Sequence, residues 1–150
     1  MSELNWQVGV VAWDSDEGRT AAKIRYDVFV VEQDVSEDEE WDDDDATGVH
    51  FLATGSGGRA LGTGRLHIYD EKAMIGKVCR IAVLRDARGH GVGFGIVQAI
   101  IEESRRMGLR KLKLHSQTYA VEFYERLGFV AYGPEFLEAN IPHRAMDLIL

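Results

Sequence analysis

The sequence predicts an α+β domain with one α/β-type unit, built on a central, twisted, mostly antiparallel sheet of about seven strands with flanking helices. Two observations lead to this prediction. Residues 49–84 alternate strand-like runs with short turns, which is typical of an antiparallel meander. Residues 77–116 then read as strand, glycine-rich turn, amphipathic helix and strand, a unit that joins two parallel strands. We therefore expect a mixed sheet in which the fourth and fifth strands run parallel.

The remaining elements follow from local hydrophobic periodicity and turn residues. The expected strands are residues 5–13, 49–54, 59–69, 73–84, 111–116, 129–133 and 143–150. The expected helices are residues 20–33, 92–107 and 118–127. The first of these helices should loosen towards its end, where β-branched residues gather. We expect a turn over residues 14–18 and a long turn over residues 134–142.

Length and composition indicate one globular domain over residues 1–150. The chain is 45% hydrophobic and 28% charged, and its length is enough for a buried core. Its one cysteine, Cys79, has no partner for an internal disulfide. No apolar run reaches the roughly 18 residues of a membrane span, and Met1–Trp6 lacks the pattern of a signal peptide. We therefore expect a cytoplasmic protein that does not bind a membrane.

The charge of the chain bears on its partners. The formal net charge is −8, which argues against nucleic acid, because phosphate backbones need a basic face. Ten Asp or Glu residues lie within residues 32–45, which we call the acidic segment. We expect a solvated loop first, since like charges repel. A lid that attracts a cationic substrate is the second interpretation. A metal site is the third, and the absence of EF-hand spacing and of a central glycine disfavours it.

A glycine-rich loop, Arg85–Gly95, connects the fourth strand to the next helix. Glycine permits positive φ and lets a ligand approach the main chain closely. The first turn of a helix adds free N–H groups and the positive end of the dipole, so the loop predicts an anion site, typically for phosphate. Its spacing is neither GxxxxGK[ST] nor GxGxxG. The pattern that fits is Arg-x-x-Gly-x-Gly over Arg88–Gly93, and a plain connecting turn is the alternative.

The motifs and their order resemble one superfamily. Arg88–Gly93 resembles the acetyl-CoA pyrophosphate loop of GNAT acyltransferases, and Ala120–Phe129 resembles the A-x-x-F-Y-x-x-x-G-F segment of that family. The expected order of strands and helices is the GNAT order from end to end. Arg25–Gln33 and Glu135–Met146 resemble the ElaA-like branch, and the first of these is also similar to acyl-homoserine-lactone synthases. The chain is identified as a member of the GNAT superfamily.

The resemblance implies acetyl-CoA as co-substrate, bound where the fourth and fifth strands splay apart. Main-chain N–H groups of the loop would hold the pyrophosphate, namely those of Gly89, His90, Gly91, Val92, Gly93 and Phe94. Arg88 would add charge, and the His90 side chain would lie at the surface or beside phosphate. The main chain of Ile81, Ala82 and Val83 would bind pantetheine. An N–H of Ile81 or Ala82 would stabilise the oxyanion, which is worth about 3 kcal/mol. No metal is expected.

Tyr124 is the expected general acid, by resemblance to the family. A phenol with a pKa near 10 can donate to a leaving thiolate whose own pKa is about 8.5. From the residues alone, Tyr124 reads as a core tyrosine on the apolar face of a short helix. A route with Cys79 as nucleophile is open but needs a base beside the thiol. His143 lies in an Ile-Pro-His element of the ElaA-like branch and has no assigned step.

The sequence defines less well which group takes the proton from the acceptor amine. An alkylammonium with a pKa near 10 is only about one-thousandth neutral at pH 7, so some group must take its proton. The first choices are Glu32, at the end of the first helix, and His115, at the end of the fifth strand. His50, His67 and a chain of waters leading to the acidic segment stay open, since a single histidine is more often structural.

The resemblance implies direct transfer of an acetyl group from acetyl-CoA to the primary amine of a small acceptor, and the acidic segment favours a cationic one. An acyl-homoserine-lactone synthase-like activity is an alternative that would depend on an acyl-carrier protein and S-adenosylmethionine. A non-catalytic acyl-CoA-binding module is another, and it would bind the cofactor without turnover. Whether two copies form a homodimer stays open.

Overall fold

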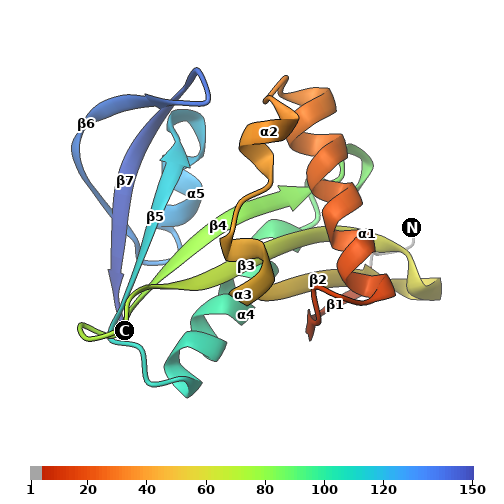
Figure 1. The fold of residues 1–150 in the computed structure, drawn as a ribbon, viewed down its shortest axis with the longest axis horizontal. Coiled ribbons are helices and arrows are strands. Elements are labelled where there is room, and N and C mark those ends of the chain that lie inside the picture. Colours follow the sequence, from red (N-terminus) through yellow and green to blue (C-terminus); the bar gives the residue numbers. More distant parts are fainter. Residues whose placement is uncertain (1–4) are drawn as a thin grey trace.

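The computed structural model describes residues 5–150, which form one seven-stranded sheet of order β1-β2-β3-β4-β5-β7-β6 (Figure 1). The strands are β1 (Trp6–Val11), β2 (Val49–Gly55), β3 (Ala60–Asp70), β4 (Ile75–Val83), β5 (Lys111–Gln117), β6 (Val130–Glu138) and β7 (Ile141–Ile149). The α-helices are α1 (Asp16–Arg25), α2 (Glu37–Glu40), α3 (Asp44–Thr47), α4 (Val92–Arg106) and α5 (Val121–Glu125). A π-helix, η1 (Tyr26–Glu32), continues α1, and the 3₁₀ turns are η2 (Ser56–Gly58), η3 (Arg85–Ala87) and η4 (Thr118–Ala120).

The mixed sheet is confirmed. Strands β1 to β4 pair antiparallel, β4 pairs parallel with β5, and β5, β7 and β6 again pair antiparallel. The β4–β5 pairing extends only from Ile75–Lys111 to Val78–Leu114, although β4 continues to Val83. The two strands therefore splay apart beyond Val78, and the opening between them is visible in Figure 1.

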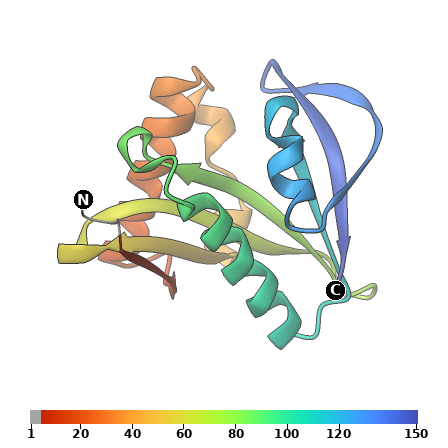
Figure 2. The same cartoon turned by 180° about the vertical axis from the view of Figure 1, so that it is seen from behind.

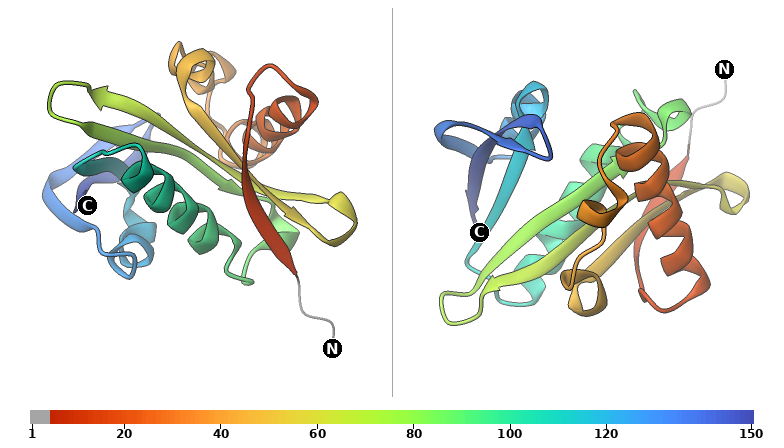
Figure 3. Two further views of the ribbon diagram at one scale, coloured as in Figure 1. Left: turned by 90° about the horizontal axis from the view of Figure 1, so that it is seen from below. Right: turned by 45° about the horizontal axis from the view of Figure 1, so that its top comes forward.

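Helices cover both faces of the sheet. Figures 2 and 3 show α4 crossing one face of β1–β4, with α5 beside β5 on that side, while α1 and the acidic segment lie on the opposite face. The apolar stripe predicted on α4 is confirmed, because Val92, Ile96 and Ile100 are buried in the main core. Ala21 and Ile24 of α1 belong to a second, smaller core on the other face. None of the helices within residues 5–150 is long and apolar enough to cross a membrane.

The first helix begins earlier than expected. Ser15 caps α1 by accepting a hydrogen bond from the Gly18 N–H at 3.0 Å, and the helix starts at Asp16, so the expected turn over residues 14–18 is wrong. A serine before two acidic residues is a helix-start signal, because its hydroxyl satisfies an N–H that has no partner in the helix. The expected loosening is confirmed as η1, where the Gln33 N–H reaches back to the Val28 carbonyl at 3.0 Å.

The expected long turn over residues 134–142 is also wrong. Strand β6 runs through Pro134 to Glu138, and a tight hairpin at Ala139 and Asn140, with φ of 49° and 62°, leads into β7 at Ile141. Pro134 is compatible with this strand because β6 is at the edge of the sheet, where one row of N–H groups pairs with nothing. The expectation that Met1–Trp6 is not a signal peptide concerns mainly residues 1–4, which lie outside the described residues.

Candidate active site

A cleft of about 990 Å³ occupies the space where β4 and β5 separate. Its walls come from η1 and the acidic segment, from β4 and the glycine loop, and from β5, α5 and the β6–β7 turn. Most of the expected site residues line this cleft: Ile81, Val83, Arg88, Gly89, Gly91, Val92, Gly93, Phe94, His115 and Tyr124. Ala82, His90 and Glu32 are not among its lining residues.

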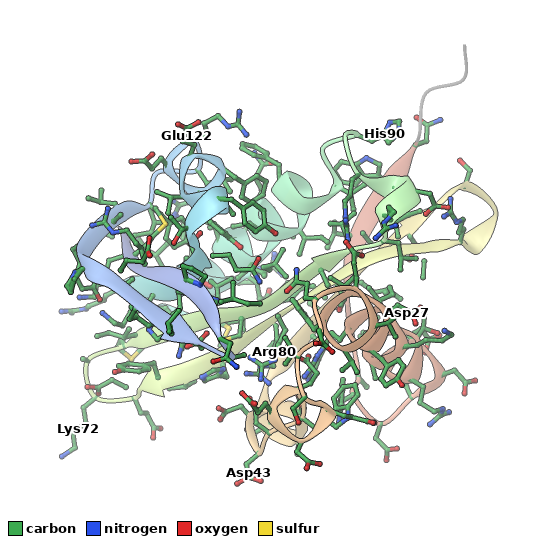
Figure 4. All side chains as sticks on the ribbon, turned by 90° about the horizontal axis from the view of Figure 1, so that it is seen from above. Asp27, Asp43, Lys72, Arg80, His90 and Glu122 are labelled. Atoms are coloured by element: carbon green, nitrogen blue, oxygen red, sulfur yellow. The ribbon has the colours of Figure 1, made fainter. Side chains whose placement is uncertain are left out.

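The glycine loop takes the backbone form that an anion site requires. Gly91 is the N-cap of α4 with φ of 81°, and Gly89 has φ of 83°, which is left-handed backbone that favours glycine. Within the described residues no side chain forms a capping hydrogen bond to this helix, so its first N–H groups have no side-chain partner. Gly91, Val92 and Gly93 line the cleft at this end of the helix. The Trp6 indole N–H donates to the His90 carbonyl at 3.3 Å and supports the loop from β1. Figure 4 shows the His90 side chain at the outer side of the loop.

Arg88 is already engaged by protein groups. Its two terminal nitrogens donate to the Glu32 carboxylate at 2.6 and 2.8 Å, and its Nε donates to the Val83 carbonyl at 3.0 Å. Hydrogen bonding and charge from Arg88 hold the pKa of Glu32 below its usual value. The structure therefore fixes Glu32, the last residue of η1, against the glycine-rich loop as a carboxylate paired with Arg88, and this geometry does not favour it as a base.

The main chain of β4 changes direction near the splay. The β3–β4 register shifts between Thr63 and Arg65, opposite Arg80, which has φ of 58°. The Leu84 N–H bonds to Leu61 of β3 at 2.9 Å, while the Val83 carbonyl points the other way, to Arg88. Because peptide groups alternate along a strand, those of Ala82 face β3.

The side chains of these residues alternate between the two faces of the sheet. Ala82 is 2% exposed and packs in the α1 core, whereas Ile81 and Val83 line the cleft. The bulge therefore leaves Ile81 as the better placed of the two oxyanion donors expected from the sequence.

Tyr124 lies on α5, in the wall of the cleft. Its ring packs edge-on against Phe123 and Phe129, with centroids 4.9 and 5.9 Å away. Phe123 also contacts Phe94 of the loop edge-on at 6.2 Å, which joins the two halves of the wall. Burial raises the pKa of the Tyr124 phenol well above its ordinary value, so the hydroxyl keeps its proton. The structure thus holds a protonated phenol on the cleft wall.

His115 lies directly after Leu114, the last β5 residue paired with β4, and so at the start of the splay. Its Nδ1 is 2.9 Å from Glu138 Oε1, at the end of β6. His143 of β7 approaches the other oxygen, with Nε2 3.7 Å from Oε2. The hydrogen bond from His115 lowers the pKa of Glu138. The cleft therefore contains a histidine that is oriented by a carboxylate.

The acidic segment is not the solvated loop that we expected, because part of it forms a buried ionic network. Arg25 of α1 is 1% exposed and donates to Glu40 at 2.7 Å and to Asp45 at 2.6 Å. Arg65 of β3, equally buried, donates to Asp45 and Asp42, both at 2.7 Å. Each of these carboxylates has a guanidinium partner, which is how charges are held inside a protein.

Arg80 extends the network to the cleft. From the β4 bulge its guanidinium reaches the Glu40 carbonyl at 3.0 Å and Asp42 at 3.2 Å. Figure 4 shows Arg80 between the acidic segment and the β6–β7 hairpin. Glu40, Asp42 and Asp45 are thus matched in charge by Arg25, Arg65 and Arg80. Within residues 5–150 no group of three or more His, Cys, Asp or Glu side chains is arranged to hold a metal.

The other titratable candidates are less suited to proton transfer. His50 is 1% exposed, its Nε2 is 2.8 Å from the Asp45 carbonyl, and burial lowers its pKa. His67 lines the cleft with Nε2 3.5 Å from Asp44, and burial lowers its pKa too. Cys79 also lines the cleft, but burial raises the pKa of its thiol, which disfavours a thiolate nucleophile.

Sequence reasoning missed Glu138 and Arg80. Glu138 was placed in a turn, so its alternation with Phe136 was not recognised as a strand pattern. The signal that was present is Asn140, since asparagine tolerates the positive φ of a hairpin turn. Arg80 has no comparable signal, because its role depends on a bulge and on partners about 40 positions away in the chain.

The comparisons with known proteins agree with this geometry. Residues 15–150 match the family model described as an acetyltransferase (GNAT) domain. The chain is 36% identical over 138 residues to the uncharacterized N-acetyltransferase YjcF of Bacillus subtilis, covering 91% of this chain and 96% of that protein. It is 38% identical over 129 residues to the uncharacterized protein YyaT of the same organism, covering 84% of each.

Solved structures show the same fold. An acyl-CoA N-acyltransferase from Pseudomonas aeruginosa superposes with a TM-score of 0.80 at 27% identity, covering 97% of this chain and 99% of that one. Escherichia coli ElaA superposes with a TM-score of 0.82 at 24% identity, covering 97% and 99%. The chain belongs to the GNAT acetyltransferase family.

Proposed function

We propose that residues 1–150 act as a single cytoplasmic domain that transfers an acetyl group from acetyl-CoA directly to the primary amine of a small cationic acceptor. The observation that carries this proposal is one cleft that joins the open N-terminus of α4 to Tyr124 and His115. An anion site at one end, a phenol and an oriented histidine are the parts that thioester aminolysis needs.

A separate group would serve each chemical step. The N–H groups between Gly89 and Phe94 would bind the pyrophosphate, and the Ile81 N–H would polarise the thioester carbonyl. His115 would take the proton of the attacking ammonium, directly or through a water, and Tyr124 would protonate the leaving thiolate. The second proton that the nitrogen loses as the amide forms would return to the Tyr124 phenolate. Because burial raises the pKa of the phenol, Tyr124 stays protonated over the whole physiological pH range, as a general acid must before it donates.

The acceptor is proposed from the charges that stay unneutralised. Glu40, Asp42 and Asp45 have arginine partners, so their negative charges attract a cation in the cleft only weakly. Glu39 and Asp44 also line the cleft, and an ammonium group entering there would meet these carboxylates. A panel of mono-, di- and polyamines against neutral and acidic amines tests this choice. Preference for the neutral or acidic acceptors would contradict it.

Tyr124→Phe is expected to reduce kcat by about 100-fold or more, the scale of general-acid catalysis. The KM for acetyl-CoA should stay within about three-fold, because the phenyl ring still packs on Phe123 and Phe129. Steady-state kinetics by thiol release measures both constants. As a control, Tyr119→Phe removes a hydroxyl from an 80% exposed ring on the same cleft and should leave kcat within about two-fold. Equal kcat for Tyr124→Phe and the native enzyme would show that another group is the acid, whereas no thiol release from either protein would favour a binding module.

Glu32→Gln is expected to tighten CoA binding by about two- to five-fold, because the carboxylate competes with the pyrophosphate for Arg88. Isothermal titration of CoA measures the effect. Asp86→Asn is the matched control, since Asp86 lies on the same loop but pairs with Arg59. Weaker binding in Glu32→Gln would show instead that Glu32 orients Arg88 for the ligand.

A further inference from the structure

We infer that Glu138 is a positioning residue that fixes the His115 ring with its proton on Nδ1 and its bare Nε2 available to the acceptor amine. This inference deepens the proposed function and rests on it for the role of His115. It assigns a function to the end of β6, a segment that the sequence analysis treated as a turn.

The hydrogen bond decides the tautomer. Glu138 Oε1 lies 2.9 Å from His115 Nδ1, and an ionised carboxylate can only accept a hydrogen bond. The pKa of Glu138 is lowered by this bond, so the carboxylate is ionised near neutral pH. The Nδ1 atom must therefore carry the proton. In a neutral ring this leaves Nε2 as the lone-pair nitrogen, which is the arrangement that lets a carboxylate orient a histidine base.

Three rings and the carboxylate hold one another in place. Phe136 packs edge-on against His115, with centroids 5.0 Å apart, and stacks on His143 at 6.0 Å. His143 Nδ1 is 2.6 Å from the Ile141 carbonyl, which only accepts, so its proton is on Nδ1. Its Nε2 stands 3.7 Å from Glu138 Oε2 and forms an ion pair whenever the ring is protonated. Lys77 of β4 also stabilises the ionised Glu138.

The irregular pairing of β6 creates this cluster. Tyr132 pairs with Ala145, but Phe136 pairs with His143, so β6 has two extra residues between these pairs. The Arg144 side chain donates to the Gly133 carbonyl at 2.9 Å within the irregular stretch, where Gly133 has φ of 72°. Two extra residues preserve the face on which side chains point while moving them along the strand. If β6 kept the register of the Tyr132–Ala145 pair, Glu138 would fall opposite Ala139, before β7 begins at Ile141, and it would not be positioned to reach His115.

The test measures the tautomer and the kinetics separately. Protein labelled with ¹⁵N-histidine is studied by imidazole NMR at a pH of about 8.5, where histidine rings are mostly neutral. The signals are assigned with a His115→Gln sample. We expect Nδ1–H in the native protein and a shift towards Nε2–H in Glu138→Ala. We also expect kcat of Glu138→Ala to fall about 10- to 100-fold, with the KM for acetyl-CoA within about three-fold.

Two further variants sharpen the result. Glu138→Gln keeps an acceptor oxygen and should retain the Nδ1–H form and more activity than Glu138→Ala. Glu135→Gln, on the same strand but bonded to Thr118, should match the native protein in both measurements. An Nε2–H ring in the native protein would overturn the inference, and so would an unchanged tautomer or unchanged kcat in Glu138→Ala. A native protein that acetylates no amine would overturn the proposed function, and the tautomer would still decide the arrangement of Glu138 and His115.

Discussion

Gly91→Glu is expected to abolish binding of acetyl-CoA and CoA, with the dissociation constant raised at least about 100-fold. The carboxylate would stand at the N-cap of α4, where the open N–H groups are expected to hold a pyrophosphate, and like charges within a few ångströms repel strongly. Left-handed backbone at φ of 81° adds strain for any residue with a Cβ. Isothermal titration of both ligands measures the loss.

A matched control separates the anion site from strain and net charge. Gly58 has φ of 80° in the β2–β3 connection, and a Cβ there would meet nothing within 4 Å. Gly58→Glu therefore carries the same backbone strain and the same added charge outside the cleft, and it should bind CoA as the native protein does. If both variants bound CoA normally, the glycine loop would not be the phosphate site. If both lost binding equally, the cause would be general destabilisation.

Arg25→Met is expected to lower the free energy of unfolding by about 3–5 kcal/mol, the cost of leaving buried charges without their partner. Arg25 is 1% exposed and forms ion pairs with both Glu40 and Asp45. Its guanidinium lies 4.9 Å from the Trp41 ring centroid. Burial already raises the pKa of Glu40 despite the adjacent Arg80 and Arg25 charges. Removing Arg25 would leave that carboxyl in an environment that disfavours its ionised form. Urea denaturation measures the change.

Lys23→Met is the control on the same helix. Lys23 pairs with Asp27 at 3.1 Å, but its side chain is 75% exposed, so solvent screens the pair and the change should stay within about 0.5 kcal/mol. Equal, small effects for Arg25→Met and Lys23→Met would contradict the buried network. Such a result would instead support the solvated loop that the composition of the acidic segment suggests.

The strand, glycine loop and helix of residues 77–107 were predictable because their signals are local. Alternation in β4, the glycines at Gly89 and Gly91, and the apolar stripe of α4 each depend on neighbouring residues only. The splay of β4 from β5 was predicted from the family resemblance. It is confirmed, because only four residues of β4, Ile75 to Val78, pair with β5. The lining of the cleft by Tyr124 and His115 was expected in the same way, whereas their chemical roles stay predictions.

The structures of the acidic segment and of the β6–β7 hairpin could not be predicted from the sequence, because they depend on distant partners. Glu40 and Asp45 look like surface charges in the sequence, and only the fold brings Arg25 and Arg65 against them. The cluster around Glu138 depends on a register shift that no local pattern encodes. In contrast, the start of α1 at Asp16 has a local signal, because Ser15 is a helix-capping residue that the sequence shows directly.

Acetyl transfer from acetyl-CoA to a small cationic amine can be detected in the product itself. The protein is incubated with ¹³C-acetyl-CoA and a panel of amines, and mass spectrometry detects the labelled N-acetyl product, with Tyr124→Phe as the matched sample. We expect labelled product from cationic primary amines, formed far more slowly by Tyr124→Phe. Binding of acetyl-CoA with no acetylated amine from any member of the panel would contradict it.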